Sequence, residues 1–465
     1  MTVFAPLDLN ALAAAGLVGP VDANGTRRVH KRRLNRSSDE ENADVPLVPI
    51  SSPEAGKAFV DIPNDLISLA TLRYIGCDDD FATQLWEEWT SWPPDDILRE
   101  TDDIIRGMPF IDFVSGHIEG RHIDAVDEDD QEWRRCMDAC GVAKEFQDAI
   151  MDPVFKPIRG TESCVFWIVE TMRMRYRGLE EIQTASRERE MALRRASTRP
   201  LGSASAFVGQ GDSLQRSGHH TTHSGNTGGR RSISSTQRLA PGIEKNTALS
   251  PEALSAMNAP GYIIVYKGVD QARINGLYDS DGKVIDLQPL ISSAPSDFHR
   301  SENAFYFTIS REIAIYYANY AKRRNKIDSV VIVQMAIPNS AIESLSETEC
   351  LRVYWPSAEW KNLVFHCRKG RRLPSELRKF RQATLVIGTI ANKPKKVYQK
   401  LDSAEHITEQ MVLRTRDGRQ AVQYVWSAED GEQFLEEHGV QELKVFPLTA
   451  REHEEWYEHE LLGGT

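Results

Sequence analysis

The sequence predicts an α+β protein in which an all-α N-terminal domain precedes a C-terminal domain of mixed strands and helices. Three observations predict this class. Apolar residues recur at helical spacing over 59–192, a polar Ser/Gly/Thr/Arg/His segment covers 193–252, and aromatic or β-branched runs alternate with helical patterns from 253 onward. We therefore divide the chain into a disordered leader (1–58), a helical domain (59–192), a disordered linker (193–252), a mixed domain (253–440) and an acidic C-terminal tail (441–465).

Composition indicates an ordinary soluble protein. The chain has 465 residues, 40% of them hydrophobic and 27% charged, and a formal net charge of −12. That charge argues against attraction of the whole protein to nucleic acid or to an anionic membrane. No apolar run approaches the roughly 20 residues that a spanning helix needs, and no basic residue precedes the short apolar run near the N-terminus. Six thinly spread cysteines suit a reducing compartment, so we expect a cytoplasmic or nuclear location and no membrane partner.

The leader mixes Ala, Gly, Pro, Ser and charged residues without periodicity, which is typical of disorder. Six of the ten residues in 27–36 are Lys or Arg. This run has the composition of a nuclear address or of a phosphate-seeking arm. Solvated charge in a flexible tail is the simpler interpretation, and we favour it.

Helical spacing defines the next domain. Leu66, Leu69, Leu72 and Ile75 predict a first helix, and a second helix over 81–89 stops at two prolines. Pro94 suits the first turn of a further helix, and two more helices are expected over 131–151 and 162–177.

Two cysteines in this domain raise the question of a metal site. Cys136 and Cys140 stand one helical turn apart, downstream of His117 and His122. Zinc clusters usually combine a tighter pair with a second matching pair, which the sequence lacks. We therefore predict two buried cysteines and no metal.

The C-terminal domain is expected to contain alternating strands and helices. Ala304–Thr308 is aromatic, as in a buried strand, and Ser310 is placed to cap a helix that reaches Ala321. The other expected elements are strands over 261–266, 329–337, 383–390 and 410–415, and helices around Trp360 and over 419–426.

The order of these pieces resembles an uncharacterised microbial family of the ADP-ribosyltransferase-like superfamily. The matching motifs are Tyr266-Lys267-Gly268, Ala304-Phe305-Tyr306-Phe307-Thr308 with the following alanine-bearing helix, Glu359-Trp360 with Arg368, Ile387 to Lys393, and Gln410 to Leu413. The resemblance covers about 260–426 and leaves residues 1–250 out. It implies a split β-sheet domain with flanking helices.

The resemblance also implies a site for NAD, used as a substrate, or for a related nucleotide. Tyr306 would stack on the nicotinamide ring, Lys267 would lie on the ribose or phosphate side, and Glu409 or Gln410 would be the third catalytic residue. Tyr266, Gly268, Phe305 and Thr308 would complete the nucleotide-binding set. Neighbouring residues of a strand point to opposite faces, so only one of Glu409 and Gln410 is expected to face the cleft.

The chemistry of such a site has clear requirements. Cleaving the bond between nicotinamide and ribose builds positive charge on the sugar, which a carboxylate stabilises in the transition state. An active domain would transfer ADP-ribose to an unknown protein acceptor or hydrolyse NAD. A non-catalytic module of the same fold, used to bind protein or nucleic acid, is the alternative.

A basic stretch lies inside this acidic protein. Ten Lys and Arg residues fall within 368–396. They could contact the phosphates of a dinucleotide or a nucleic-acid partner. A solvated surface is the simpler interpretation, and the single aromatic residue Phe380 does not favour nucleic acid.

Overall fold

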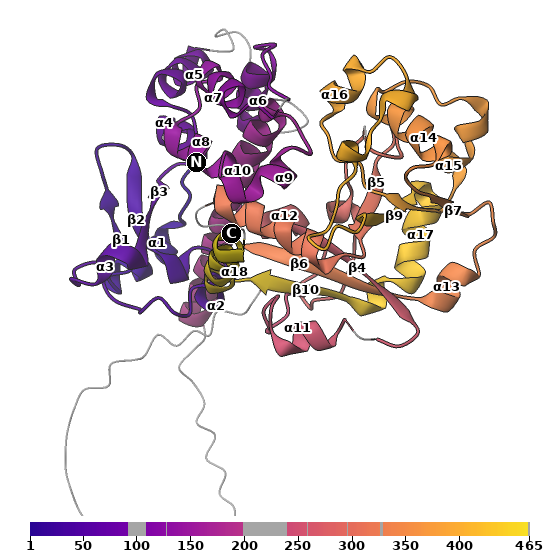
Figure 1. The fold of residues 1–465 in the computed structure, drawn as a ribbon. Helices are drawn as coiled ribbons and strands as arrows, with labels where there is room; N and C mark the ends of the chain where they lie inside the picture. Colours follow the sequence, from indigo (N-terminus) through magenta and orange to yellow (C-terminus); the bar gives the residue numbers. More distant parts are fainter. Residues whose placement is uncertain are drawn as a thin grey trace, which may run out of the picture.

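The computed structural model describes residues 1–91, 108–126, 128–198, 240–257, 259–294, 296–325 and 329–463. These residues form a mixed α/β fold with a small N-terminal sheet, a helical region and a larger C-terminal sheet (Figure 1). The helix expected after Pro94, and residues 199–239 of the expected linker, lie outside the described residues. No helix among the described residues has the length and apolar character needed to cross a membrane.

The prediction of a disordered leader is wrong. Residues 1–63 contain α1 (Pro6–Ala14), β1 (Val18–Val21), β2 (Thr26–His30), α2 (Ser38–Glu41), α3 (Ala55–Ala58) and β3 (Phe59–Pro63). The three strands form an antiparallel sheet in the order β1-β2-β3. Asp8 of α1 is 2% exposed and accepts hydrogen bonds from Ser186 and Arg189, so contacts with a distant helix order this segment.

The basic run 27–36 is likewise part of the fold and not a flexible tail. Its first residues belong to β2, where the Val29 side chain is fully buried. Arg32 pairs with Asp39, and Arg36 pairs with Glu188. These charges are therefore engaged within the protein.

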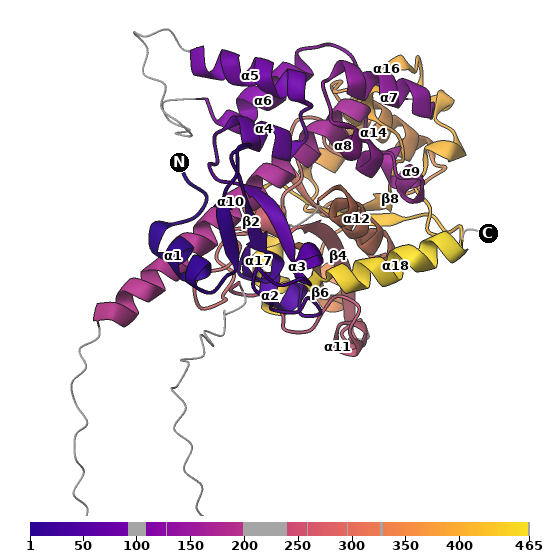
Figure 2. The ribbon, with the colours of Figure 1, turned by 90° about the vertical axis from the view of Figure 1, so that its left-hand side faces the viewer.

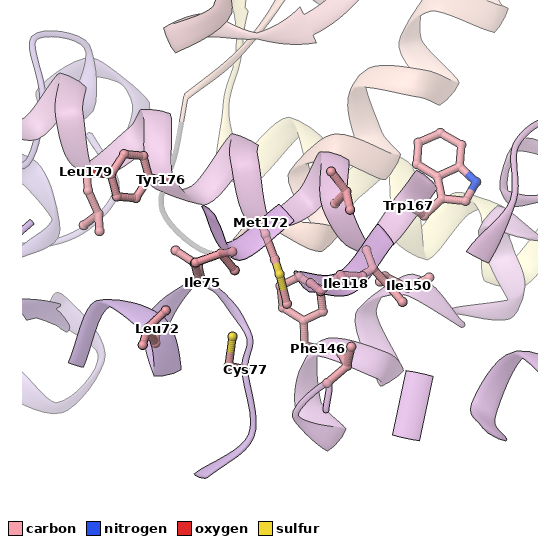
Figure 3. Packing of buried hydrophobic residues seen from close by; sticks show 14 of the residues in the cluster. Leu72, Ile75, Cys77, Ile118, Phe146, Ile150, Trp167, Met172, Tyr176 and Leu179 are labelled. Carbon is pink, nitrogen blue, oxygen red and sulfur yellow. The ribbon is translucent and has the colours of Figure 1, made fainter. Parts of the chain in front are cut away.

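The helical region is built around one long helix. It contains α4 (Leu69–Ile75), α5 (Asp79–Ser91), α6 (Phe110–Glu119), α7 (Asp130–Ala139), α8 (Lys144–Ile150), α9 (Lys156–Arg159) and α10 (Cys164–Thr198). Figure 3 shows Met172, Tyr176 and Leu179 of α10 facing side chains of the shorter helices, and Figure 2 shows α10 running beneath them. Cys136 and Cys140 are buried in this core and unpaired by disulfide, and no group of metal-ligating side chains exists in the described part of the chain.

The C-terminal sheet has seven strands in the described residues, in the order β10-β6-β4-β5-β9-β8-β7. All neighbours are antiparallel except β7 and β8. The strands are β4 (Tyr262–Asp270), β5 (Ala304–Thr308), β6 (Val330–Pro338), β7 (Cys350–Val353), β8 (Leu385–Thr389), β9 (Val422–Ser427) and β10 (Leu443–Leu448). β4 pairs with β6 over its whole length but with β5 only at Tyr266 and Thr308, so the sheet opens between β4 and β5.

Helices cover both faces of this sheet. They are α11 (Pro251–Ser255), α12 (Arg311–Arg324), α13 (Asn339–Glu343), α14 (Ala358–Arg368), α15 (Lys379–Gln382), α16 (Lys395–Lys400), α17 (Ala428–His438) and α18 (Ala450–Gly463). α12 packs on β4 and β6, and α14 belongs to the cluster that contains Val425 of β9. On the other face, Phe434 and Leu435 of α17 join the cluster of Phe305 and Phe307.

Two predicted elements are wrong. Residues 410–415 are not a strand, because Glu409–Met411 form a 3-10 turn that is followed by irregular chain. Residues 419–426 are not a helix, because Val422–Ser427 form β9 between β5 and β8. The acidic tail is also ordered: Leu443–Leu448 pair with β6 as β10, and α18 follows. The sequence patterns of β9 and β10 are too short to identify a strand locally, and both segments are strands because they pair with neighbouring strands.

α12 links the two halves of the protein. The Tyr320 hydroxyl donates to the Ile150 carbonyl at 3.0 Å, and the Tyr320 ring stacks on Phe155 at 5.1 Å. Arg175 of α10 donates to the carbonyl of Arg324 at the end of α12. The helical region and the C-terminal sheet therefore share one buried interface.

Candidate functional site

Tyr306 lies at the centre of β5, on the sheet face that α14 covers. Its side chain is half-buried, and its hydroxyl contacts Ser296 Oγ, the Phe298 amide at 3.3 Å and His299 Nδ1 at 3.1 Å. Burial raises the pKa of Tyr306 above its usual range, so the phenol stays neutral at physiological pH. Residues 296–299 thus hold the ring by its hydroxyl end.

A buried ionic network holds this segment in place. Asp297 is 3% exposed and accepts hydrogen bonds from Arg368 Nε at 2.7 Å, the Ala391 amide at 2.9 Å and Gln423 Nε2 at 2.8 Å. Arg368 also donates to Glu162 at 2.9 Å. Burial opposes the charge of Arg368, yet the carboxylates of Asp297 and Glu162 hold the pKa of Arg368 well above its usual range. The Asp297 carboxylate is therefore matched by a permanent positive charge.

Gln423 is the site residue that the sequence interpretation missed. β9 pairs Val425 with Tyr306, and strand residues two apart share a face, so Gln423 lies on the same face as the tyrosine. Its side chain is 5% exposed and bonded to Asp297. The signal available in the sequence was the β-branched and aromatic run Val422-Gln423-Tyr424-Val425-Trp426, which suits a strand.

Glu409 and Gln410 do not reach Tyr306. Both are exposed on the 3-10 turn, and Glu409 pairs with Arg414. Neither belongs to a strand beside β5, because β9 occupies that position. The structure therefore does not support the expected catalytic role of either residue.

Lys267 points to the opposite face from Tyr306. Its ammonium group donates to the Leu290 carbonyl at 2.8 Å, Ser292 Oγ at 2.7 Å and the Tyr306 carbonyl at 3.3 Å, and lies 5.7 Å from the Phe307 ring. Burial, with the nearby charge of Arg273, holds the pKa of Lys267 well below its usual range. The three hydrogen-bonding positions of the Lys267 nitrogen are all occupied by contacts within the protein. Lys267 therefore stabilises the loop after β4 and has no donor left for a ribose or a phosphate.

The remaining expected nucleotide contacts are packing residues. Tyr266 is 3% exposed beneath α12, and Phe305 is 2% exposed on the face away from Tyr306. A Cβ atom at Gly268 would lie 2.2 Å from the Ala314 carbonyl oxygen, so this glycine permits close approach of α12. Thr308 Oγ1 donates to Val422 and accepts from the Ser310 amide, which ties β5 to β9 and to the start of α12.

A small cavity adjoins the segment that holds Tyr306. It has a volume of about 220 Å³ and is lined by Phe298, His299, Arg300, Glu302, Arg372, Leu373, Arg378, Arg381 and Gln382. His299 connects the two features, because it lines the cavity and contacts the Tyr306 hydroxyl.

Half of the charges in the basic stretch 368–396 form ion pairs within the protein. Arg368 is buried, Lys379 pairs with Glu359, Lys393 with Glu128 and Lys396 with Asp124. Only Arg372, Arg378 and Arg381 of the stretch line the cavity.

Comparison of the chain with protein-family models, with curated proteins and with solved structures finds no match in any of the three. The geometry of the site must therefore carry the functional argument. It offers a phenol ring held by its hydroxyl, a buried amide and an arginine-lined cavity.

Proposed function

We propose that residues 253–463 form an ADP-ribosyltransferase-like domain that binds NAD or a related nucleotide on the Tyr306 face without efficient cleavage. The opening of the sheet between β4 and β5 supports the split-sheet fold that the motif resemblance implies. The half-buried Tyr306 ring on this face supports an aromatic contact with a planar ligand.

The identity of Gln423 carries the non-catalytic part of this proposal. On β9, Val425 is opposite Tyr306, and Gln423, two residues away on the same face, donates its amide to Asp297. The Asp297 charge is already matched by Arg368. Glu302 of the neighbouring cavity is likewise paired with Arg381. Because neither of these carboxylates is free to stabilise a cationic ribose, transfer of ADP-ribose or hydrolysis of NAD should be very slow.

The alternative use of this fold for nucleic-acid binding finds less support. Five of the ten charges of the stretch 368–396 have acidic partners in the protein: Arg368, Lys379, Arg381, Lys393 and Lys396. If the domain is not catalytic, a protein that binds the Tyr306 face is the alternative to a nucleotide ligand.

The test is NAD binding by the full chain, measured by calorimetry, with nicotinamide release followed in parallel. We expect saturable binding, release close to the uncatalysed rate, and at least a tenfold loss of affinity in Tyr306→Leu. Tyr354→Leu is the matched control, because Tyr354 is an exposed tyrosine of the same domain. Absence of binding, or unchanged affinity in a folded Tyr306→Leu variant, would remove NAD as the ligand, and rapid release of nicotinamide would contradict the non-catalytic assignment.

A further inference from the structure

The cavity beside His299 is lined mainly by positive charge. Four arginines, Arg300, Arg372, Arg378 and Arg381, contribute to its wall, against the single carboxylate of Glu302. That carboxylate pairs with Arg381 at 2.7 Å. One of the four arginine charges is therefore matched inside the protein.

The other three arginines lack acidic partners in the described part of the chain. Within the described ranges, neither Arg300 nor Arg372 nor Arg378 lies within ion-pair distance of a carboxylate. Their sequence neighbours behave differently, because Lys379 pairs with Glu359 and Arg371 lies over the Phe365 ring. In a protein of net charge −12, three unpaired guanidinium groups around one hollow indicate an anion site.

His299 supplies a second, independent observation. Its side chain is 2% exposed and its Nδ1 contacts the Tyr306 hydroxyl, whereas its Nε2 atom is buried without a hydrogen-bond partner in the described chain. A buried polar atom normally has a partner, so an unsatisfied one beside a cavity points to a ligand. Burial lowers the pKa of His299 to about 4, so the ring is neutral and carries one N–H at pH 7. When Tyr306 donates to Nδ1, that N–H is on Nε2.

We propose that this arginine pocket, defined by Arg300, Arg372, Arg378, Arg381 and His299, binds a compact phosphate-bearing anion of the pyrophosphate type. Guanidinium groups bind phosphate oxygens through paired N–H donors, and several arginines around one hollow match a doubly charged or more highly charged group. The cavity volume of about 220 Å³ is below the roughly 300 Å³ at which ligand pockets usually begin. The pocket therefore accommodates a diphosphate, free or at the end of a larger ligand, and excludes a whole dinucleotide.

This inference does not rest on the proposed NAD function, because it concerns a separate set of residues and a different ligand. Its test is calorimetric titration of the full chain with sodium pyrophosphate in the absence of NAD. We expect saturable binding that weakens as salt is raised from 50 to 200 mM, since charge pairing is screened. The double variant Arg372→Gln/Arg378→Gln should lose about tenfold in affinity or more, as expected for two charge-assisted contacts.

The matched control is Arg371→Gln/Lys379→Gln, which removes the same charge from neighbouring positions outside the cavity. We expect the affinity of this control variant for pyrophosphate to stay within about twofold of the wild-type value. A change of that size is small, because about 1.4 kcal/mol of binding free energy corresponds to a tenfold change in affinity. Absence of saturable binding by the wild type, or equal losses in both double variants, would overturn the pocket. Titrations with ADP and adenosine then separate the sources: tighter binding of ADP assigns the pocket to a nucleotide diphosphate, and binding of pyrophosphate alone assigns it to a free anion.

Discussion

Removal of the Arg368 guanidinium should be among the most damaging single changes in the C-terminal domain. Arg368→Met keeps much of the aliphatic volume but leaves Asp297, which is 3% exposed, without its cation. It also leaves Glu162, the carboxylate that Arg368 Nη1 contacts at 2.9 Å. Breaking a buried ion pair by deleting one partner costs about 3–5 kcal/mol, because an uncompensated charge stays buried. We expect a loss of that size in the free energy of unfolding.

The assay is urea unfolding of the full chain, followed by tryptophan fluorescence and circular dichroism. Asp297→Asn should lower the free energy of unfolding by less, because the asparagine oxygen can still accept the hydrogen bond from the Ala391 amide. The double variant Arg368→Met/Asp297→Asn should lose less free energy of unfolding than the sum of the two single losses. Arg371→Gln, an exposed neighbour, should change the free energy of unfolding by no more than about 0.5 kcal/mol. If Arg368→Met lowers the free energy of unfolding by less than about 1 kcal/mol, the reasoning that this substitution leaves a buried charge without a partner is refuted.

Three further outcomes are expected. Gly268→Ala places a Cβ atom 2.2 Å from the Ala314 carbonyl oxygen and should lower stability by about 1–3 kcal/mol in urea unfolding, whereas a neutral effect would show that α12 can shift freely. His299 has its pKa lowered from 6.5 to about 4 by burial, so its contribution to stability is complete above pH 6.5 and is lost as pH falls toward 4. That contribution amounts to roughly 3 kcal/mol. His299→Gln should therefore flatten the dependence of unfolding free energy on pH, and an unchanged slope would contradict the assignment. Tyr320→Phe removes the hydrogen bond to the Ile150 carbonyl and should cost about 1–3 kcal/mol in the same assay, while a loss near zero would argue against a tight interface.

The sequence predicted the elements whose signals are local. Ser310 caps α12 by accepting from the Ile313 amide, and the aromatic run Ala304–Thr308 forms β5. β6 is a continuous buried run in the sequence and a fully buried strand for most of its length in the structure. These patterns need no knowledge of distant partners, so they could be interpreted directly.

The missed elements depend on partners far away in the chain. β10 is a strand because β6 lies beside it, and α1 is held in place partly because Asp8 contacts Arg189 across 181 residues. The direction of Lys267 could not be predicted either. Its motif places it beside Gly268, but the face it occupies follows from the pairing of Tyr266 with Thr308, which the sequence does not display.

The shared interface explains why the C-terminal region should not be studied as an isolated fragment. Ile313 and Tyr320 of α12 are buried in the same apolar cluster as the helical region, together with Leu413 and Ala421. Cutting the chain at the polar segment before residue 253 would expose these side chains and would remove Glu162 from Arg368. Asp297 is bonded to that same arginine, and residues 296–299 hold the Tyr306 hydroxyl. The helical region therefore contributes to the candidate site through an unbroken chain of contacts, and its removal should loosen the Tyr306 ring even where the sheet survives.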